Sequence, residues 1–194
     1  MPMETIDESL AGMQLWRMTK LQYQQLWEKG FFRPEERVEL VFGMVVEMPP
    51  SSPEHDESTS RVQQFLTMKL AARAKVRCQS TFDATGDSMP EPDVFVIPNG
   101  DYWHSHPTRA NLVVEVSRSS ARYDRITKRK LYALAEVDEY WIVDHNTGTV
   151  VVHRDRRAGG WDTMRTFTRG QRIAMLAFPD VEIDVAEILP PTGV

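Results

Sequence analysis

Residues 111–117, N-L-V-V-E-V-S, are the stretch that decides the fold. Their branched apolar side chains favour a buried strand at the centre of a sheet. A second apolar stretch, P-D-V-F-V-I-P at 92–98, is bounded by prolines and indicates a further strand. A carboxylate inside a buried strand is costly unless it is paired or bound to a cation, so Glu115 indicates an ion pair or a metal site.

The segments on either side of these strands predict a mixed sheet with packed helices. Before them stand a hairpin over 37–48, which turns at Gly43, and a helix over 53–74 that Ser52 caps. Three further helices are expected: one that Thr19 caps with Gln22 and that stops at Gly30, one from Ser119 or Ser120 to 136, and a short one over 184–189. Further strands are expected over 76–84, 139–144, 149–153 and 161–168. This order predicts an α/β fold with an α+β mixed sheet.

The composition is that of an ordinary globular protein. A chain of 194 residues, 41% hydrophobic and 26% charged, predicts one domain over residues 18–190 after a loosely ordered segment over 1–17. The single cysteine, Cys78, excludes an intramolecular disulfide and is interpreted as a packed strand residue. No apolar run approaches the roughly 18 residues of a membrane span, and no secretory signal is present, so we expect a cytoplasmic protein without a membrane partner.

Charge and motifs exclude several function classes. The formal net charge of −5 and the pI of about 5.6 are not those of a protein that simply coats nucleic acid. A nuclease remains compatible, because a bound cation neutralises acidic ligands and a local basic patch can hold phosphates. The sequence contains no G-x-S-x-G, G-x-x-x-x-G-K, H-E-x-x-H or G-x-G-x-x-G motif, which argues against the enzyme classes that these motifs mark.

Two carboxylates interrupt the apolar strands. Asp93 opens one strand and Glu115 breaks the next, 22 residues later, so adjacent strands can place them side by side. Paired carboxylates suit Mg²⁺ or Mn²⁺, and such an ion neutralises a phosphate and activates a bound water. In a second interpretation, Asp93 merely starts a strand and Glu115 pairs with Arg109 or Lys128. Both interpretations remain open at this point.

Three further positions allow two interpretations each. Asp124, Lys128 and Tyr132 follow one another at intervals of four and share one helix face, so Lys128 either stabilises a phosphoryl transition state or forms a surface ion pair with Asp124. Glu39 is either a third acidic ligand or an exposed edge residue. His55, in the first turn of a helix, either contacts substrate or metal or is a surface histidine without a role.

Six segments in this order resemble a known family. They are E-L-V-F-G-M-V-V-E-M-P-P at 39–50, His55, P-D-V-F-V-I at 92–97, L-V-V-E-V-S at 112–117, D-R-I-T-K-R-K-L-Y at 124–132 and V-D-E-Y-W-I-V-D at 137–144. Together they are similar to the Uma-type restriction endonuclease family of the PD-(D/E)XK restriction-endonuclease-like superfamily, over about residues 18–190.

The resemblance implies a fold and a site. The fold would be an α-β-β-β-α-β core with an added N-terminal helix and hairpin. Asp93 and Glu115 would be metal ligands for Mg²⁺ or Mn²⁺, with Glu39 as a further acid. Ser117 stands where the superfamily usually has its lysine, and the resemblance points instead to Lys128 on the following helix. His55, Asp124 and Tyr132 match recurring family positions and, with Ser117, would contact substrate or support the ligands.

Two functions follow as hypotheses. The first is a Mg²⁺-dependent endonuclease that hydrolyses phosphodiester bonds in DNA with a metal-activated water, and a homodimer would suit duplex cleavage. The second is a catalytically inactive nuclease-fold module with a binding or regulatory role. A Lys128 nitrogen within a few ångströms of the carboxylates favours the enzyme. Five basic residues of the helical segment either contact the DNA backbone or form a solvated surface: Arg118, Arg122, Arg125, Arg129 and Lys130.

Overall fold

A mixed sheet forms the centre of the molecule. The computed structural model describes residues 15–33 and 35–191, and within them six strands form one sheet in the order β3-β4-β5-β6-β7-β8. The strands are β3 (Ala74–Cys78), β4 (Val94–Pro98), β5 (Leu112–Ser117), β6 (Tyr140–Asp144), β7 (Thr149–Arg157) and β8 (Gly160–Phe167). In this sheet β5 and β6 run parallel, and the other neighbouring strands run antiparallel.

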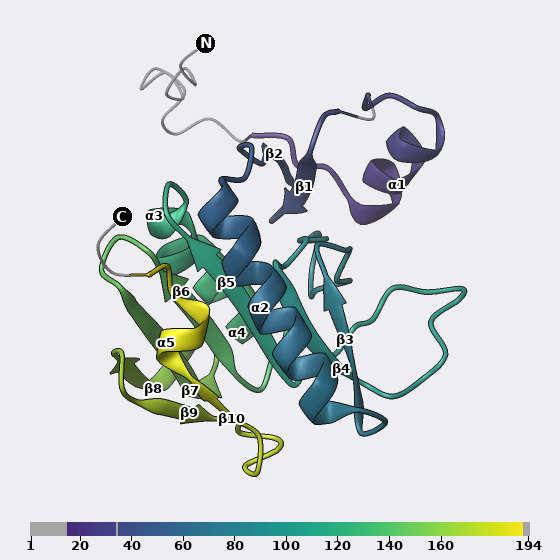
Figure 1. Cartoon of the computed structure of the whole chain (residues 1–194). Helices are drawn as coiled ribbons and strands as arrows, with labels where there is room; N and C mark the ends of the chain where they lie inside the picture. Colours follow the sequence, from purple (N-terminus) through teal and green to yellow (C-terminus); the bar gives the residue numbers. More distant parts are fainter. Residues whose placement is uncertain (1–14, 34, 192–194) are drawn as a thin grey trace.

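Helices cover both faces of the sheet (Figure 1). A parallel pair requires a crossover, and the segment between β5 and β6 supplies it as α3 (Ala121–Tyr123), the π-helical turn η2 (Asp124–Lys128) and α4 (Arg129–Leu134). The opposite face carries α2 (Pro53–Leu70), α5 (Val185–Ile188) and the small hairpin β9 (Arg172–Ala174) and β10 (Glu182–Asp184). The expected α-β-β-β-α-β core is therefore confirmed.

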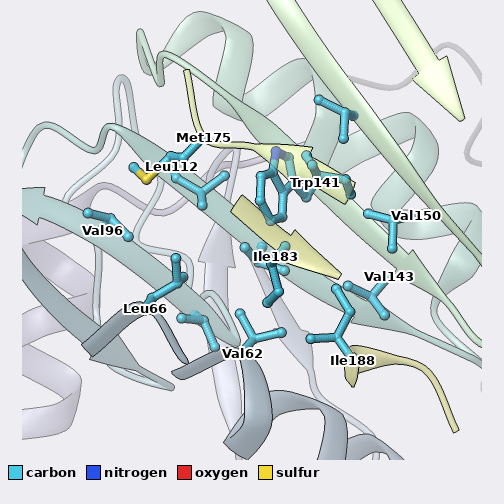
Figure 2. Packing of buried hydrophobic residues seen from close by; sticks show 14 of the residues in the cluster. Val62, Leu66, Val96, Leu112, Trp141, Val143, Val150, Met175, Ile183 and Ile188 are labelled. Carbon is cyan, nitrogen blue, oxygen red and sulfur yellow. The ribbon is translucent and has the colours of Figure 1, made fainter. Parts of the chain in front are cut away.

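Strand alternation divides the core into two layers. On β5, Leu112, Val114 and Val116 face the layer that α2 and α5 close, whereas Val113 belongs to the layer under α4. Figure 2 shows the first layer, in which α2, β10 and α5 pack their apolar side chains around Trp141. Because successive strand residues alternate between faces, Glu115 lies on the same face as Val113 and points towards the crossover helices.

The predicted N-terminal helix and hairpin precede the core. Thr19 and Gln22 form the expected capping box of α1 (Lys20–Glu28). The hairpin consists of β1 (Val38–Val41) and β2 (Met44–Glu47), and the Tyr23 hydroxyl donates to the Val38 carbonyl at 2.8 Å. The helix thus fixes β1, the strand that carries Glu39. Of the segment expected to be loosely ordered, residues 1–14 lie outside the described residues.

The hairpin turn depends on Gly43. Its φ is +75°, and a Cβ built there would lie 2.7 Å from Cβ of Arg17. We expect Gly43→Ala to lower the free energy of unfolding by more than the about 1–2 kcal/mol of left-handed strain alone. Gly148→Ala is the matched control, since Gly148 also has a positive φ but no atom lies within 4 Å of its Cβ position. Equal losses in urea unfolding of the two variants would contradict this packing role.

Several expected boundaries were wrong. The second helix ends at Leu70 rather than 74, because Ala71 takes a φ of 46°. The strand expected over 76–84 ends at Cys78, because Gln79 takes a φ of 42° and turns the chain. Ser120 makes no capping bond and its hydroxyl donates instead to Asp124. No helix in the described part of the chain is long and apolar enough to cross a membrane.

Candidate active site

A buried ion triad joins the hairpin, the central strand and the crossover helix. The Lys128 ammonium lies 2.8 Å from Glu39 Oε2 and 3.0 Å from Glu115 Oε1. All three side chains are buried, so the charges are held away from water. Burial alone lowers the pKa of Lys128, but the adjacent charges of Glu115 and Glu39 outweigh it and hold the pKa well above its usual value. Lys128 therefore remains an ammonium at neutral pH.

Asp93 lies beside this triad at the start of β4. Its Oδ2 accepts from the Val116 N–H at 2.8 Å and from Nε2 of His55 at 3.1 Å, and its own N–H donates to Glu115 Oε2 at 3.3 Å. Burial raises the pKa of Asp93, but the hydrogen bond and charge of His55 outweigh it, so the pKa is lowered. The strand pair β4–β5 thus brings Asp93 and Glu115 side by side.

Glu115 is a buried carboxylate that three donors contact. Burial raises its pKa to about 8, even though Lys128 acts in the opposite direction. Its Oε1 accepts from the Tyr132 hydroxyl at 2.6 Å as well as from Lys128. A group whose pKa is raised this far by burial and by neighbouring carboxylates is typical of a functional site.

Ser117 and Asp124 form a separate buried pair. The Ser117 hydroxyl donates to Asp124 Oδ2, and the Ser120 hydroxyl donates to the same oxygen at 2.6 Å. Burial raises the pKa of Asp124, and these hydroxyls oppose it. Asp124 does not bind Lys128, so the interpretation of these two residues as a surface ion pair is wrong. Ser117, in the usual lysine position, instead anchors the start of the crossover helix.

The π-helical turn brings Tyr123 into the site, which sequence reasoning missed. Its hydroxyl donates to Glu39 Oε1 at 3.1 Å, and its ring lies 5.8 Å from the Lys128 nitrogen. In a regular α-helix, residues five apart do not share a face, but an i to i+5 turn brings them together. A search for residues three or four apart therefore does not identify Tyr123 and Lys128 as neighbours.

Glu39, His55 and Glu115 each have a defined environment in the structure. Glu39 is 1% exposed, so it is not an exposed edge residue, and its Oε2 also accepts from the Glu91 N–H at 3.0 Å. His55 is partly buried against Asp93 and is not a free surface histidine. The ion-pair partner of Glu115 is Lys128 rather than Arg109. The five basic residues of the helical segment are all exposed.

The donor set suits a hard cation. Across residues 15–33 and 35–191, no three His, Cys, Asp or Glu side chains are grouped so as to hold a metal ion by themselves. Mg²⁺, however, is commonly held by one or two carboxylates, with waters and substrate phosphate as its other ligands. Asp93 and Glu115 fit this mode, because a carboxylate has about four lone-pair sites and Glu115 Oε2 accepts one hydrogen bond in the described chain.

The mixed sheet with its crossover helices has a nuclease-like fold, and comparison with known proteins shows the family of the chain. The chain belongs to the Uma2 family, described as "Putative restriction endonuclease", whose model matches residues 21–186. A solved structure from Anabaena variabilis ATCC 29413, described as a putative nuclease belonging to DUF820, has a similar fold. It gives a TM-score of 0.68 at 14% identity, over 88% of this chain and 97% of that chain. A search of curated proteins finds no match.

Proposed function

We propose that this protein is a Mg²⁺- or Mn²⁺-dependent endonuclease that hydrolyses phosphodiester bonds in DNA. The observation that carries the proposal is the 3.0 Å contact between the Lys128 nitrogen and Glu115, which favours an enzyme over an inactive module. The ammonium lies where a lysine can act on a phosphate held at Asp93 and Glu115. Membership of the Uma2 family, described as "Putative restriction endonuclease", supports the same function.

Each residue of the site has a chemical task in this proposal. Asp93 and Glu115 would hold the cation, which when bound would neutralise the scissile phosphate and lower the pKa of a water. Lys128 would offset the negative charge that develops on phosphorus oxygens in the transition state. Glu39 accepts a hydrogen bond from the ammonium, Tyr123 donates to Glu39, and Tyr132 donates to the Glu115 carboxylate, so the site needs little reorganisation.

Exposed basic residues would hold the DNA backbone. Arg118, Arg122 and Lys130 lie on the surface of the segment that carries Lys128. Phosphate contacts of this kind add affinity that falls with salt and carry no sequence information directly. The net charge of −5 is compatible with a nucleic-acid substrate for two reasons. The cation would neutralise the acidic site residues, and the exposed basic residues would contact the phosphates.

The experiment that tests the proposal is cleavage of a mixed panel of plasmid, linear duplex, single-stranded DNA and RNA with Mg²⁺ or Mn²⁺. We expect metal-dependent cutting by the wild type that is lost in both Glu115→Ala and Lys128→Ala. The ratio of nicked to linear plasmid reports whether two protomers act together. Cleavage that persists in EDTA, or that both variants retain, would overturn the proposal. No cutting of any substrate would favour the binding module.

His55 is expected to position Asp93. Residues that orient a metal ligand typically contribute 10- to 100-fold to metal affinity or activity, so we expect His55→Ala to lower Mn²⁺ affinity and cleavage by about 10-fold or more. His55→Gln retains an N–H donor and should recover part of the loss. Calorimetric titration with Mn²⁺ checks both variants. Equal Mn²⁺ affinity in wild type and His55→Ala would show that His55 has no such role.

A further inference from the structure

A second site lies on the other side of the crossover helix. A cavity of about 390 Å³ opens between the helical segment and the outer strands β7 and β8. We call it the β7–β8 pocket. Its polar lining consists of two guanidinium groups, three threonine hydroxyls and one imidazole, from Arg125, Arg129, Thr147, Thr149, Thr166 and His153. Such a lining offers hydrogen-bond donors and positive charge but contains no carboxylate, which is suited to an oxyanion.

The Arg125 side chain and the Arg129 backbone are held in place by contacts within the chain. Arg125 pairs with Asp144, a buried carboxylate that also accepts from the backbone N–H groups of Asn146 and Thr147. The Arg129 backbone carbonyl accepts from the Trp161 indole at 2.9 Å, which fixes the helix against β8. Among the described residues, no carboxylate lies within salt-bridge distance of the Arg129 guanidinium, so its charge is available to a ligand.

His153 supplies an independent sign of a ligand. Its side chain is 2% exposed, and its buried Nδ1 has no hydrogen-bond partner in the described part of the chain. Burial and the charge of Arg129 lower the pKa of His153 to about 4, so the imidazole is neutral at pH 7. A buried polar group without a partner is uncommon in a folded protein and calls for an explanation.

The strand register places the pocket in the same row as the candidate active site. Glu115 lies opposite Ile142, Ile142 opposite Val151, and Val151 opposite Thr166. Neighbouring strands are about 4.8 Å apart, so the pocket begins roughly 10 Å from Glu115 and reaches roughly 14 Å. Measured along the axis of a duplex, at 3.4 Å per nucleotide of one strand, this span corresponds to about three to four nucleotides. Successive helix residues point about 100° apart, so Lys128 faces one site while Arg129 faces the other.

We propose that the β7–β8 pocket binds one phosphate group. Resting on the proposed function, we infer that this phosphate belongs to the nucleic-acid strand whose cleaved bond lies at Asp93 and Glu115. A free phosphate or a mononucleotide carries the same group, so the experiment must distinguish these sources. The pocket would fix the position of the strand relative to the cut and would add affinity without reading sequence.

The test uses the whole chain in EDTA, so that binding is measured without cleavage. In the first arm, inorganic phosphate is titrated while the imidazole resonances of the five histidines are followed by NMR. We expect His153 to shift in the wild type and not in Arg129→Gln. In the second arm, the affinity for a labelled DNA duplex is measured over a range of salt concentrations. We expect Arg129→Gln to weaken binding about tenfold and to reduce the salt slope by about 0.9.

Arg165→Gln is the matched control, because Arg165 is exposed on the same strand as Thr166 but alternates to the opposite face. It should leave the His153 shift and the DNA affinity unchanged. A His153 shift with phosphate but equal DNA binding in Arg129→Gln would overturn the nucleic-acid source and leave a free-phosphate site. No shift of His153 in the wild type would overturn the pocket itself. Since neither arm depends on cutting, a wild type that fails to cleave but shows the shift would refute the nuclease alone.

Discussion

Replacement of Glu115 by glutamine, or of Asp93 by asparagine, is expected to abolish divalent-metal binding and to reduce cleavage by more than about 100-fold. The magnitude follows because residues that only orient a metal ligand contribute about 10- to 100-fold, and a ligand itself should contribute more. Both replacements keep an acceptor oxygen for the existing N–H donors, which are the Asp93 N–H to Glu115 and the Val116 N–H to Asp93. Isothermal titration with Mn²⁺ measures the loss.

As a control, urea unfolding shows whether each variant is folded. Lys128 retains Glu39 as a partner when Glu115 becomes glutamine, so we expect the variant to unfold cooperatively in urea, close to the wild type. Asp93→Ala and Glu115→Ala should lose metal binding in the same way. If both alanine variants gave unchanged Mn²⁺ titrations, the assignment of the metal site to Asp93 and Glu115 would fail.

Replacement of Lys128 by methionine is expected to have the second large effect, on stability and on cleavage together. It leaves the buried carboxylates of Glu39 and Glu115 without their cation, and the loss of one partner from a buried ion pair costs about 3–5 kcal/mol. The cost should depend on pH. Without Lys128, the folded-state pKa of Glu115 rises further above about 8, so this part of the deficit grows as the pH rises above about 8, where Glu115 ionises in the wild type, and vanishes at lower pH.

A double variant separates stability from chemistry. Adding Glu39→Gln to Lys128→Met removes one of the two unpaired charges, while the glutamine oxygen can still accept from the Glu91 N–H. We expect the double variant to recover part of the lost free energy of unfolding and none of the cleavage. Recovery of cleavage with stability would show that Lys128 serves only to hold the fold.

Much of the fold could be predicted from the spacing of apolar residues and from the residues that cap or end helices and strands. The apolar runs around Asp93 and Glu115 form the central strands, and the caps at Thr19 and Ser52 begin helices as expected. The end of the strand at Cys78 could not be predicted, because glutamine is not a residue type that favours the positive φ that Gln79 takes. The strands β9 and β10 have three residues each, too short to show a period.

Part of the candidate site could also be predicted from the pattern of apolar residues. Asp93 and Glu115 interrupt apolar strands, and the short connection between them predicts that they are neighbours, which agrees with the β4–β5 pairing. The family resemblance points to Lys128, whereas spacing alone favours a surface pair. Tyr123 could not be found, because a π-helical turn changes which residues share a face and leaves no mark in the sequence.

Anomalous diffraction from crystals grown or soaked with Mn²⁺ would test most directly whether Asp93 and Glu115 bind a divalent cation. We expect a peak within about 2.0–2.3 Å of carboxylate oxygens of both Asp93 and Glu115, absent in Glu115→Gln crystals treated identically. A peak bound elsewhere in the molecule, or an intact Lys128–Glu115 contact with no peak beside it at saturating Mn²⁺, would contradict the account.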